Sequence, residues 1–169
     1  MKTFLAVLFT MALLRGPLAD SQVMAPSPVD ASVAWGKPIN GLVVGISCDT
    51  YTTNSATLLK IYFHLANVGD REIQGIIQRD RMCIVAVNGR YYAQRSWGGR
   101  FSWMPPGKKY GPIPIQSERL RRIPVLAVRP TISGSAPAPS VQEGTNTVSV
   151  YYKLGEKLVQ SGEIKIVGR

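Results

Sequence analysis

The sequence is poor in the side chains that carry most enzyme chemistry: its 169 residues include one histidine, two cysteines and 10 acidic residues. Any Ser–His–Asp or Cys–His site would have to use His64, and no G-x-S-x-G motif is present. A zinc site usually takes four ligands, which one histidine and two cysteines do not supply. The carboxylates have no obvious mates for general acid–base catalysis, and no glycine-rich phosphate loop occurs. We therefore expect no enzymatic activity, no metal and no cofactor.

Long hydrophobic runs are also scarce, and the clearest one lies at the N-terminus. Lys2 precedes an apolar stretch over residues 4–14, and residues 19–21 (ADS) have the small-x-small pattern of a cleavage site. About eleven residues are too few to cross a hydrocarbon core of about 30 Å. We therefore predict a signal peptide over residues 1–21, with export to the periplasm, the cell surface or the extracellular space. The alternatives are an uncleaved membrane anchor and a buried helix; after cleavage, no stable membrane span is expected.

The two cysteines, Cys48 and Cys83, are too few to form a disulfide framework. In an oxidising compartment they could close one disulfide, and its loop of about 35 residues would contribute roughly 3–4 kcal/mol. The alternative is two separate buried thiols that pack as small hydrophobic side chains. The sequence supports both interpretations equally.

Helical periodicity is absent after the predicted signal peptide, whereas alternating apolar patterns recur. In residues 59–66 apolar side chains alternate with others, which places His64 on the wet face of a half-buried strand. Asn88-Gly89 joins two β-rich runs and predicts a hairpin, because a type I′ turn needs positive φ at both central positions. Prolines near residues 112–124 confine the strands there to edges or short pieces. About seven short strands predict an all-β, immunoglobulin-like antiparallel sandwich, preceded by an N-terminal signal helix.

Two segments rich in proline and small residues border or interrupt these strands. Residues 22–33 carry two prolines and no periodic pattern, which predicts a flexible lead-in. Residues 129–144 are rich in proline, serine, alanine and glycine. Because too few residues follow to form another domain, we predict a long loop inside the fold. The expected organisation is therefore one sandwich over residues 34–169.

The segment WGKPINGL opens this predicted domain at Trp35. Asn40-Gly41 is expected to turn the chain into the first strand, because both residue types tolerate positive φ. Trp35 is expected to cover one end of the core. The alternative role for Trp35 is a ligand platform.

Basic residues outnumber acidic ones by 20 to 10, a formal charge of +10. Removal of residues 1–21 takes away two basic residues and one acidic residue, leaving 18 against 9, so the excess belongs to the predicted domain. Such a balance favours acidic partners. The alternative is that the basic residues keep a β protein soluble and protect its sheet edges.

Arginines interleaved with aromatic residues suggest where an acidic partner would bind. Arginine pairs with carboxylate, sulfate or phosphate groups, and aromatic side chains stack on rings. The predicted acidic-ligand surface consists of Arg90, Tyr92, Arg95, Trp97, Arg100 and Trp103. The alternative is that the aromatic rings fill the core and the arginines form a solvated rim.

Four stretches carry a resemblance to a known architecture: WGKPINGLVVGIS, LLKIYFHLANVGDREI, IVAVNGRYY and MPPGKKYGPIPI. Over residues 34–167 the chain resembles bacterial exported domains of the immunoglobulin-like or fibronectin-type-III-like kind, which implies the sandwich fold but no particular activity. The NVGD turn followed by a later PG turn is also similar to the intracellular proteinase inhibitor family, which shares this architecture. The export signal and the 129–144 insertion depart from that family, and no inhibitory loop carries over.

We therefore expect an exported, non-enzymatic binding or structural module of the cell envelope. Its expected partner is an acidic glycan or envelope polymer, or another envelope protein. Nucleic acid is not an expected partner of an exported protein. The alternative function is that of a small secreted protein similar to protease inhibitors.

Overall fold

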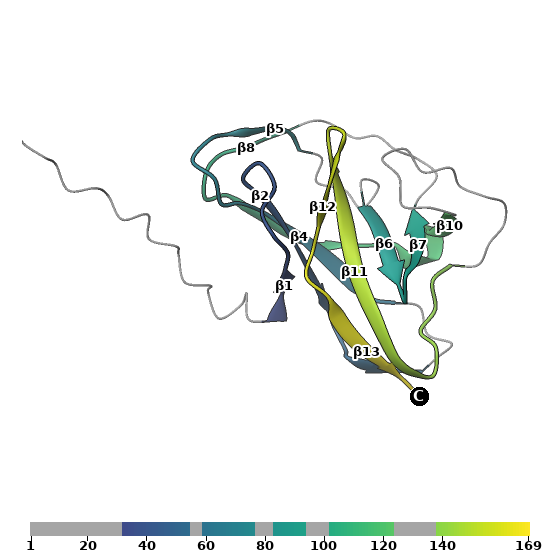
Figure 1. Ribbon diagram of the computed structural model, residues 1–169. Helices are drawn as coiled ribbons and strands as arrows, with labels where there is room; N and C mark the ends of the chain where they lie inside the picture. Colours follow the sequence, from purple (N-terminus) through teal and green to yellow (C-terminus); the bar gives the residue numbers. More distant parts are fainter. Residues whose placement is uncertain (1–31, 55–58, 77–82, 94–101, 124–137) are drawn as a thin grey trace, which may run out of the picture.

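The computed structural model describes residues 32–54, 59–76, 83–93, 102–123 and 138–169 (Figure 1). Strands dominate these ranges and nearly all their pairings are antiparallel, which confirms the prediction of an all-β protein. The predicted signal peptide and most of the predicted lead-in lie outside the described residues. In the ranges above, no helix has the length and apolar character needed to cross a membrane.

A four-stranded sheet, sheet A, has the strand order β1-β2-β4-β9 (Figure 1). Its strands are β1 (Ala34–Trp35), β2 (Leu42–Cys48), β4 (Ile61–Asn67) and β9 (Lys109–Pro114). All three pairings are antiparallel. The edge position of β9 agrees with the prediction for proline-containing strands, because proline has no N–H for a second neighbour.

A larger sheet, sheet B, is built around the long strand β11 (Gly144–Leu154). One edge of β11 pairs with β6 (Cys83–Val87). The other edge is shared, because β13 (Ile164–Gly168) pairs with its first half and β12 (Lys157–Gln160) with its second half. The outer strands are β7 (Arg90–Ala93), β10 (Arg121–Ile123) and β3 (Thr52–Thr53), of which β3 runs parallel to β13.

The smaller elements lie beside these sheets. β5 (Ile73–Ile76) and β8 (Ser102–Met104) form a separate two-stranded sheet. A 3-10 helix, η3 (Ser117–Arg119), follows β9. Asn88 and Gly89 have φ values of 48° and 73°, so the predicted hairpin turn between β6 and β7 is confirmed.

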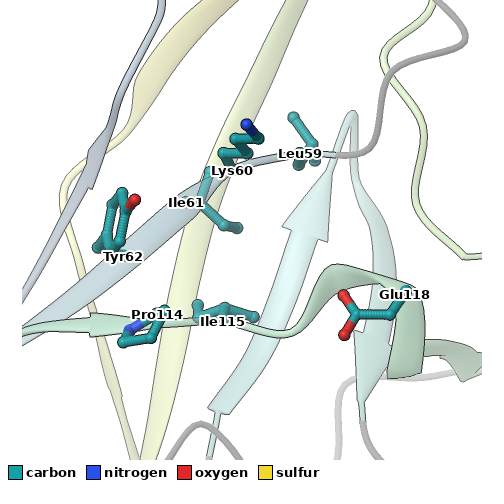
Figure 2. Close-up of a pocket in the computed structure, with 7 residues that line it drawn as sticks. All are labelled: Leu59, Lys60, Ile61, Tyr62, Pro114, Ile115 and Glu118. Carbon is teal, nitrogen blue, oxygen red and sulfur yellow. The ribbon is translucent and has the colours of Figure 1, made fainter.

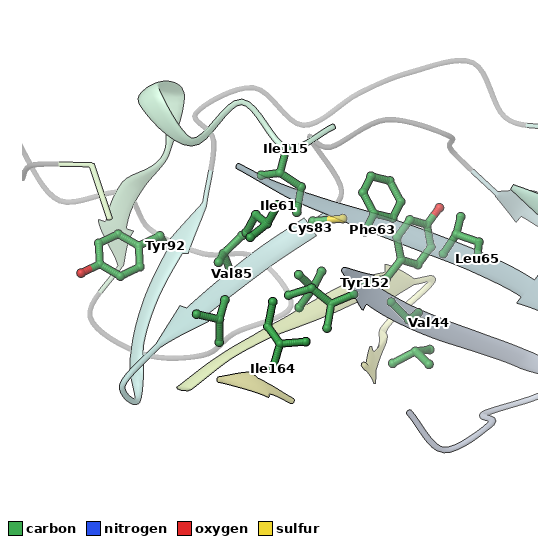
Figure 3. Packing of buried hydrophobic residues seen from close by; sticks show 14 of the residues in the cluster. Val44, Ile61, Phe63, Leu65, Cys83, Val85, Tyr92, Ile115, Tyr152 and Ile164 are labelled. Atoms are coloured by element: carbon green, nitrogen blue, oxygen red, sulfur yellow. The ribbon is translucent and has the colours of Figure 1, made fainter. Parts of the chain in front are cut away.

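The main core contains buried side chains from both sheets, as Figure 3 shows. On β4, Ile61, Phe63 and Leu65 are fully buried while His64 is only half-buried, so the predicted alternation is confirmed. The rings of Phe63 and Tyr152 stack with centroids 6.2 Å apart and join the two sheets. A second, smaller apolar cluster lies on the opposite face of sheet B and contains Ile84, Ala93 and Ile123, with Tyr91, Tyr151 and Leu158 packed against it.

One structural detail corrects the sequence predictions. Trp35 does not cover an end of the core: its indole ring lies on the outer face of sheet A, over Gly45 and beside His64. Gly45 permits this position, because a Cβ there would lie 2.8 Å from Trp35 Cε3. Between β12 and β13, residues 161–163 lie opposite only residues 149–150 of β11, so the Ser161-Gly162 step adds one residue to the pairing, as a bulge does. Ser161 Oγ accepts a hydrogen bond from Val150 N at 2.9 Å at this step.

The described end of the predicted 129–144 loop also differs in detail. Val141 is 1% exposed and packs into the main core, so this part of the segment belongs to the folded domain. Gly144 already begins β11, so the loop ends one residue earlier than predicted. Residues 124–137 lie outside the described ranges.

Candidate functional site: a groove between β1 and β12

A groove of about 710 Å³ opens where β1 meets β12. Pockets of 300–1,000 Å³ are typical of ligand sites. Both aromatic and cationic side chains contribute to this groove. Its lining consists of Trp35, Gly36, Lys37, Ile39, Tyr151, Leu158, Gln160, Ser161 and Gly162.

Two glycines allow β1 to lie between β2 and the end of β12. Gly36 N donates to Val44 O at 2.9 Å on one side, and Gly162 N donates to Ala34 O at 3.0 Å on the other. A Cβ on Gly36 would lie 1.8 Å from Gln160 O, closer than any real contact. The backbones of β1 and β12 therefore approach each other directly, and the groove forms on the outer side of this junction.

Trp35 forms the first wall of the groove, and the side chain of His64 supports its ring. Its centroid lies 6.0 Å from that of His64 in an edge-to-face arrangement, with an interplanar angle of 63°. His64 Nε2 and Ser47 Oγ share a hydrogen bond of 2.8 Å, which orients the imidazole. Because this support is already in place, little side-chain freedom is lost when a ligand stacks on the exposed part of the indole.

The second wall carries Tyr151, whose ring meets Tyr91 edge-to-face with centroids 6.0 Å apart. Burial raises the pKa of Tyr151, and the neighbouring Tyr91 and Glu163 raise it further, whereas a hydrogen bond with Ser149 lowers it. Tyr151 therefore remains a neutral phenol at physiological pH. Its hydroxyl group can both donate and accept hydrogen bonds.

The charges around the groove are mainly positive. Lys37 is the one charged residue among the described residues that line it. Lys153 lies opposite Leu158 in the β11–β12 register and so on the same face. Glu163 opposes these cations with a negative charge that acts on Tyr151. The groove therefore favours anionic ligands, and the negative charge of Glu163 lowers their affinity.

The sequence-predicted ligand surface is only partly described. Arg90 is exposed at the start of β7, and Trp103 is 57% exposed on β8 in the separate two-stranded sheet. Tyr92 is 9% exposed and packs into the main core, so its ring is not offered to a ligand. The other three members lie outside the described residues: Arg95, Trp97 and Arg100.

Sequence reasoning misses most of the groove because its walls come from distant parts of the chain. The sequence suggests Trp35 as an alternative ligand platform, but it does not single out Lys37 or Tyr151 as ligand contacts. More than 110 residues separate Trp35 from Tyr151. The one local signal is the pair of glycines, Gly36 and Gly162, which permit close backbone approach.

A smaller hollow of about 350 Å³ lies between the start of β4 and the segment from β9 to η3 (Figure 2). Its floor is apolar, and Tyr62 is held at its side by a 2.9 Å hydrogen bond from its hydroxyl to Asp49 Oδ2. This hydrogen bond raises the pKa of Tyr62. Lys60 and Glu118 line the hollow with opposite charges, so it does not favour an acidic ligand as the groove does.

The lone histidine and the cysteines do not assemble a metal site within the described ranges. No group of three or more His, Cys, Asp or Glu side chains there could hold a metal ion. Cys48 and Cys83 are both thiols, on strands of different sheets, and both pack against the main core. Burial raises the pKa of Cys48, and Asp49 adds to this, while hydrogen bonds to Tyr51 and the Thr50 backbone lower it.

We expect iodoacetamide to modify Cys48 at pH 7 several-fold more slowly than an exposed thiol, because the thiolate is the nucleophile and the pKa of Cys48 is raised. The rate should still rise as the pH passes 9. Cys83, which is 0% exposed, should react only after denaturation. Timed labelling with peptide mass spectrometry measures both rates. Fast labelling at pH 7 would contradict this expectation, as would an unlabelled chain about 2 Da lighter than its reduced form, which marks a disulfide.

Comparison with known proteins adds no functional assignment. No model of a known protein family matches the chain, and no curated protein is similar to it. The geometry and charge of the β1–β12 groove are therefore the basis for the proposed function.

Proposed function

We propose that this protein is an exported, non-enzymatic binding module of the cell envelope, and that its β1–β12 groove holds a segment of an acidic polysaccharide. One observation carries the proposal: Trp35, Tyr151 and Lys37 line the same groove. Sugar rings present C–H faces to aromatic side chains, and a uronate carboxylate pairs with an ammonium group. The aromatic rings and the cation of the groove together favour an acidic sugar, because a neutral sugar has no charge to pair and a simple anion has no ring to stack.

The proposed architecture of the binding module is an immunoglobulin-like sandwich. The antiparallel pairings and a core shared by sheets A and B support it. In such a sandwich, β1 is the strand that lies between the two sheets, since it pairs with β2 and also accepts a hydrogen bond from Gly162. The groove then occupies a seam of the sandwich, where a long polymer can enter and leave without a closed pocket.

The proposal predicts that Trp35→Ala lowers the affinity for oligogalacturonate about tenfold, because the stacking surface is removed. Lys37→Ala should lower it about threefold and flatten its dependence on salt, since one screened charge contact is lost. Glu163→Gln should raise the affinity, because the opposing charge disappears. Isothermal titration calorimetry at two ionic strengths measures all three effects.

The matched control is Trp103→Ala, which removes an exposed tryptophan that lies outside the groove. It should leave the affinity unchanged, and a neutral oligosaccharide should bind the wild-type chain far more weakly than oligogalacturonate. Equal affinities for all variants and no salt dependence would reject the groove. Loss of binding on Arg95→Ala or Arg100→Ala, with Trp35→Ala unaffected, would assign the ligand to the sequence-predicted surface.

A further inference from the structure

Three turns meet at one end of sheet A and form a single rigid surface, which we call the turn platform and define as residues 40–41, 67–70 and 105–108. Backbone hydrogen bonds join the turns in pairs. Val68 N donates to Gly41 O at 2.8 Å, while Gly107 N donates to Asn67 O at 2.9 Å. Asn67 N in turn donates to Lys108 O at 3.0 Å. Figure 1 shows these segments together beside the β5–β8 sheet.

The buried side chain of Asn67 holds the platform together by hydrogen bonds. It is 1% exposed, and its Nδ2 donates to both Arg71 O and Met104 O at 2.8 Å. Its Oδ1 accepts from Gly69 N at 3.0 Å. A Cβ on Gly69 would lie 3.1 Å from Gly41 Cα, so two of the turns are in direct backbone contact. A surface fixed in this way loses little conformational entropy on binding a partner.

The platform and the strand that leads into it expose two large apolar side chains. Val68 is 60% exposed at the tip of its turn. Trp103, 57% exposed, lies on β8 two residues before Pro105, and its carbonyl accepts a hydrogen bond from the Tyr110 hydroxyl at 3.2 Å. These are two of the four large apolar side chains that are exposed among the described residues. Exposed apolar groups on a preorganised surface are typical of protein contacts.

The charges at this end alternate in a way that suits a second copy of the chain. Exposed Asp70, Arg71 and Glu72 follow one turn, so two carboxylates flank one cation there, and exposed Lys108 ends another turn. Lys108 Nζ lies 5.7 Å from the centroid of the Tyr110 ring, which positions it at the surface. Under a twofold rotation, the same patch contacts itself, so acidic and basic segments side by side are self-complementary.

We propose that the turn platform is the contact surface of a symmetric dimer. Val68 and Trp103 of the two copies meet near the twofold axis, and Asp70 and Glu72 of each copy face Lys108 of the other. The apolar contact is small, so the dimer dissociates in the micromolar range and not in the nanomolar range. This inference does not depend on the polysaccharide groove, which lies at the β1–β12 junction.

Sedimentation velocity of the full chain, from low micromolar to near-millimolar concentration, tests the dimer. The sedimentation coefficient should rise with concentration for the wild type and stay at the monomer value for Val68→Asp. Val167→Asp, at another exposed valine, is the matched control and should dimerise normally. A wild type that stays monomeric throughout would overturn the proposal, as would Val68→Asp that dimerises like the control.

Exchange of charges gives a second test that does not rely on Val68. Asp70→Lys and Lys108→Asp should each weaken self-association about tenfold or more, because like charges then face each other. An equimolar mixture of the two variants should restore dimers, since each copy supplies the charge that the other lacks. Undiminished self-association of both variants, or a mixture that stays monomeric, would overturn the proposed pairing.

Discussion

Replacement of Gly36 by alanine is expected to lower the free energy of unfolding by about 2–4 kcal/mol and to abolish measurable binding in the groove. The added Cβ would lie 1.8 Å from Gln160 O, and neither backbone can yield without breaking the contacts of β1. The hydrogen bonds from Gly36 N to Val44 O and from Gly162 N to Ala34 O would be lost together. Urea denaturation and calorimetric titration with oligogalacturonate measure the two effects.

Gly155→Ala is the matched control for this substitution. Gly155 has a φ of 59°, and a Cβ added there would meet no atom within 4 Å, so only the backbone conformation is strained. Its cost should be about 1 kcal/mol, and groove binding should be preserved. If Gly36→Ala and Gly155→Ala had the same stability and the same affinity, the close backbone contact between β1 and β12 would be contradicted.

Replacement of Asn67 by alanine should lower the free energy of unfolding by about 3 kcal/mol. Asn67 is buried, and its amide supplies hydrogen bonds to Arg71 O and Met104 O while accepting one from Gly69 N. Alanine removes all three hydrogen bonds, and a buried carbonyl that loses its donor costs about 1–3 kcal/mol. The midpoint of urea unfolding should fall in proportion.

Two further variants test whether the hydrogen bonds of Asn67 stabilise the fold or whether any substitution in these turns is destabilising. Asn67→Asp keeps an acceptor for Gly69 N but loses the two donors and buries a charge, so it should be at least as destabilising as alanine. Asn40→Gly should change stability by about 0.5 kcal/mol or less, because Asn40 is exposed with a φ of 51°, which glycine adopts freely. If Asn67→Ala unfolds at the same urea concentration as the wild type, the turns do not depend on this side chain.

Several elements of the fold could be predicted because their signals are local. The alternation around Phe63 reveals which side chains of β4 face inward, since successive strand residues point to opposite faces. Asn88-Gly89 predicts its hairpin, because both φ values must be positive and these residue types tolerate that. Pro112 and Pro114 predict an edge strand, because neither has a backbone N–H to pair.

The candidate site could not be predicted in the same way. Tyr92 looks available in the sequence, but the pairing of β7 with β6 turns it into the core and its neighbour Tyr91 toward the opposite face. The Asn88-Gly89 turn sets the β6–β7 register, but which face of this hairpin meets the core depends on the pairing of β6 with β11 and on packing against sheet A. Trp35 likewise lies on the outer face only because Gly45 leaves room for its ring.

Four features can be read from the sequence alone: the all-β class, the strand of alternating residues at 59–66, the Asn88-Gly89 turn and the basic balance of charge. Each follows from the chemistry of neighbouring residues. The folded chain is needed to bring Trp35, Lys37 and Tyr151 into one groove and to join three separate turns into one platform. Both surfaces arise from long-range backbone pairing, in which strand register and close glycine contacts, and not local propensity, determine which side chains meet.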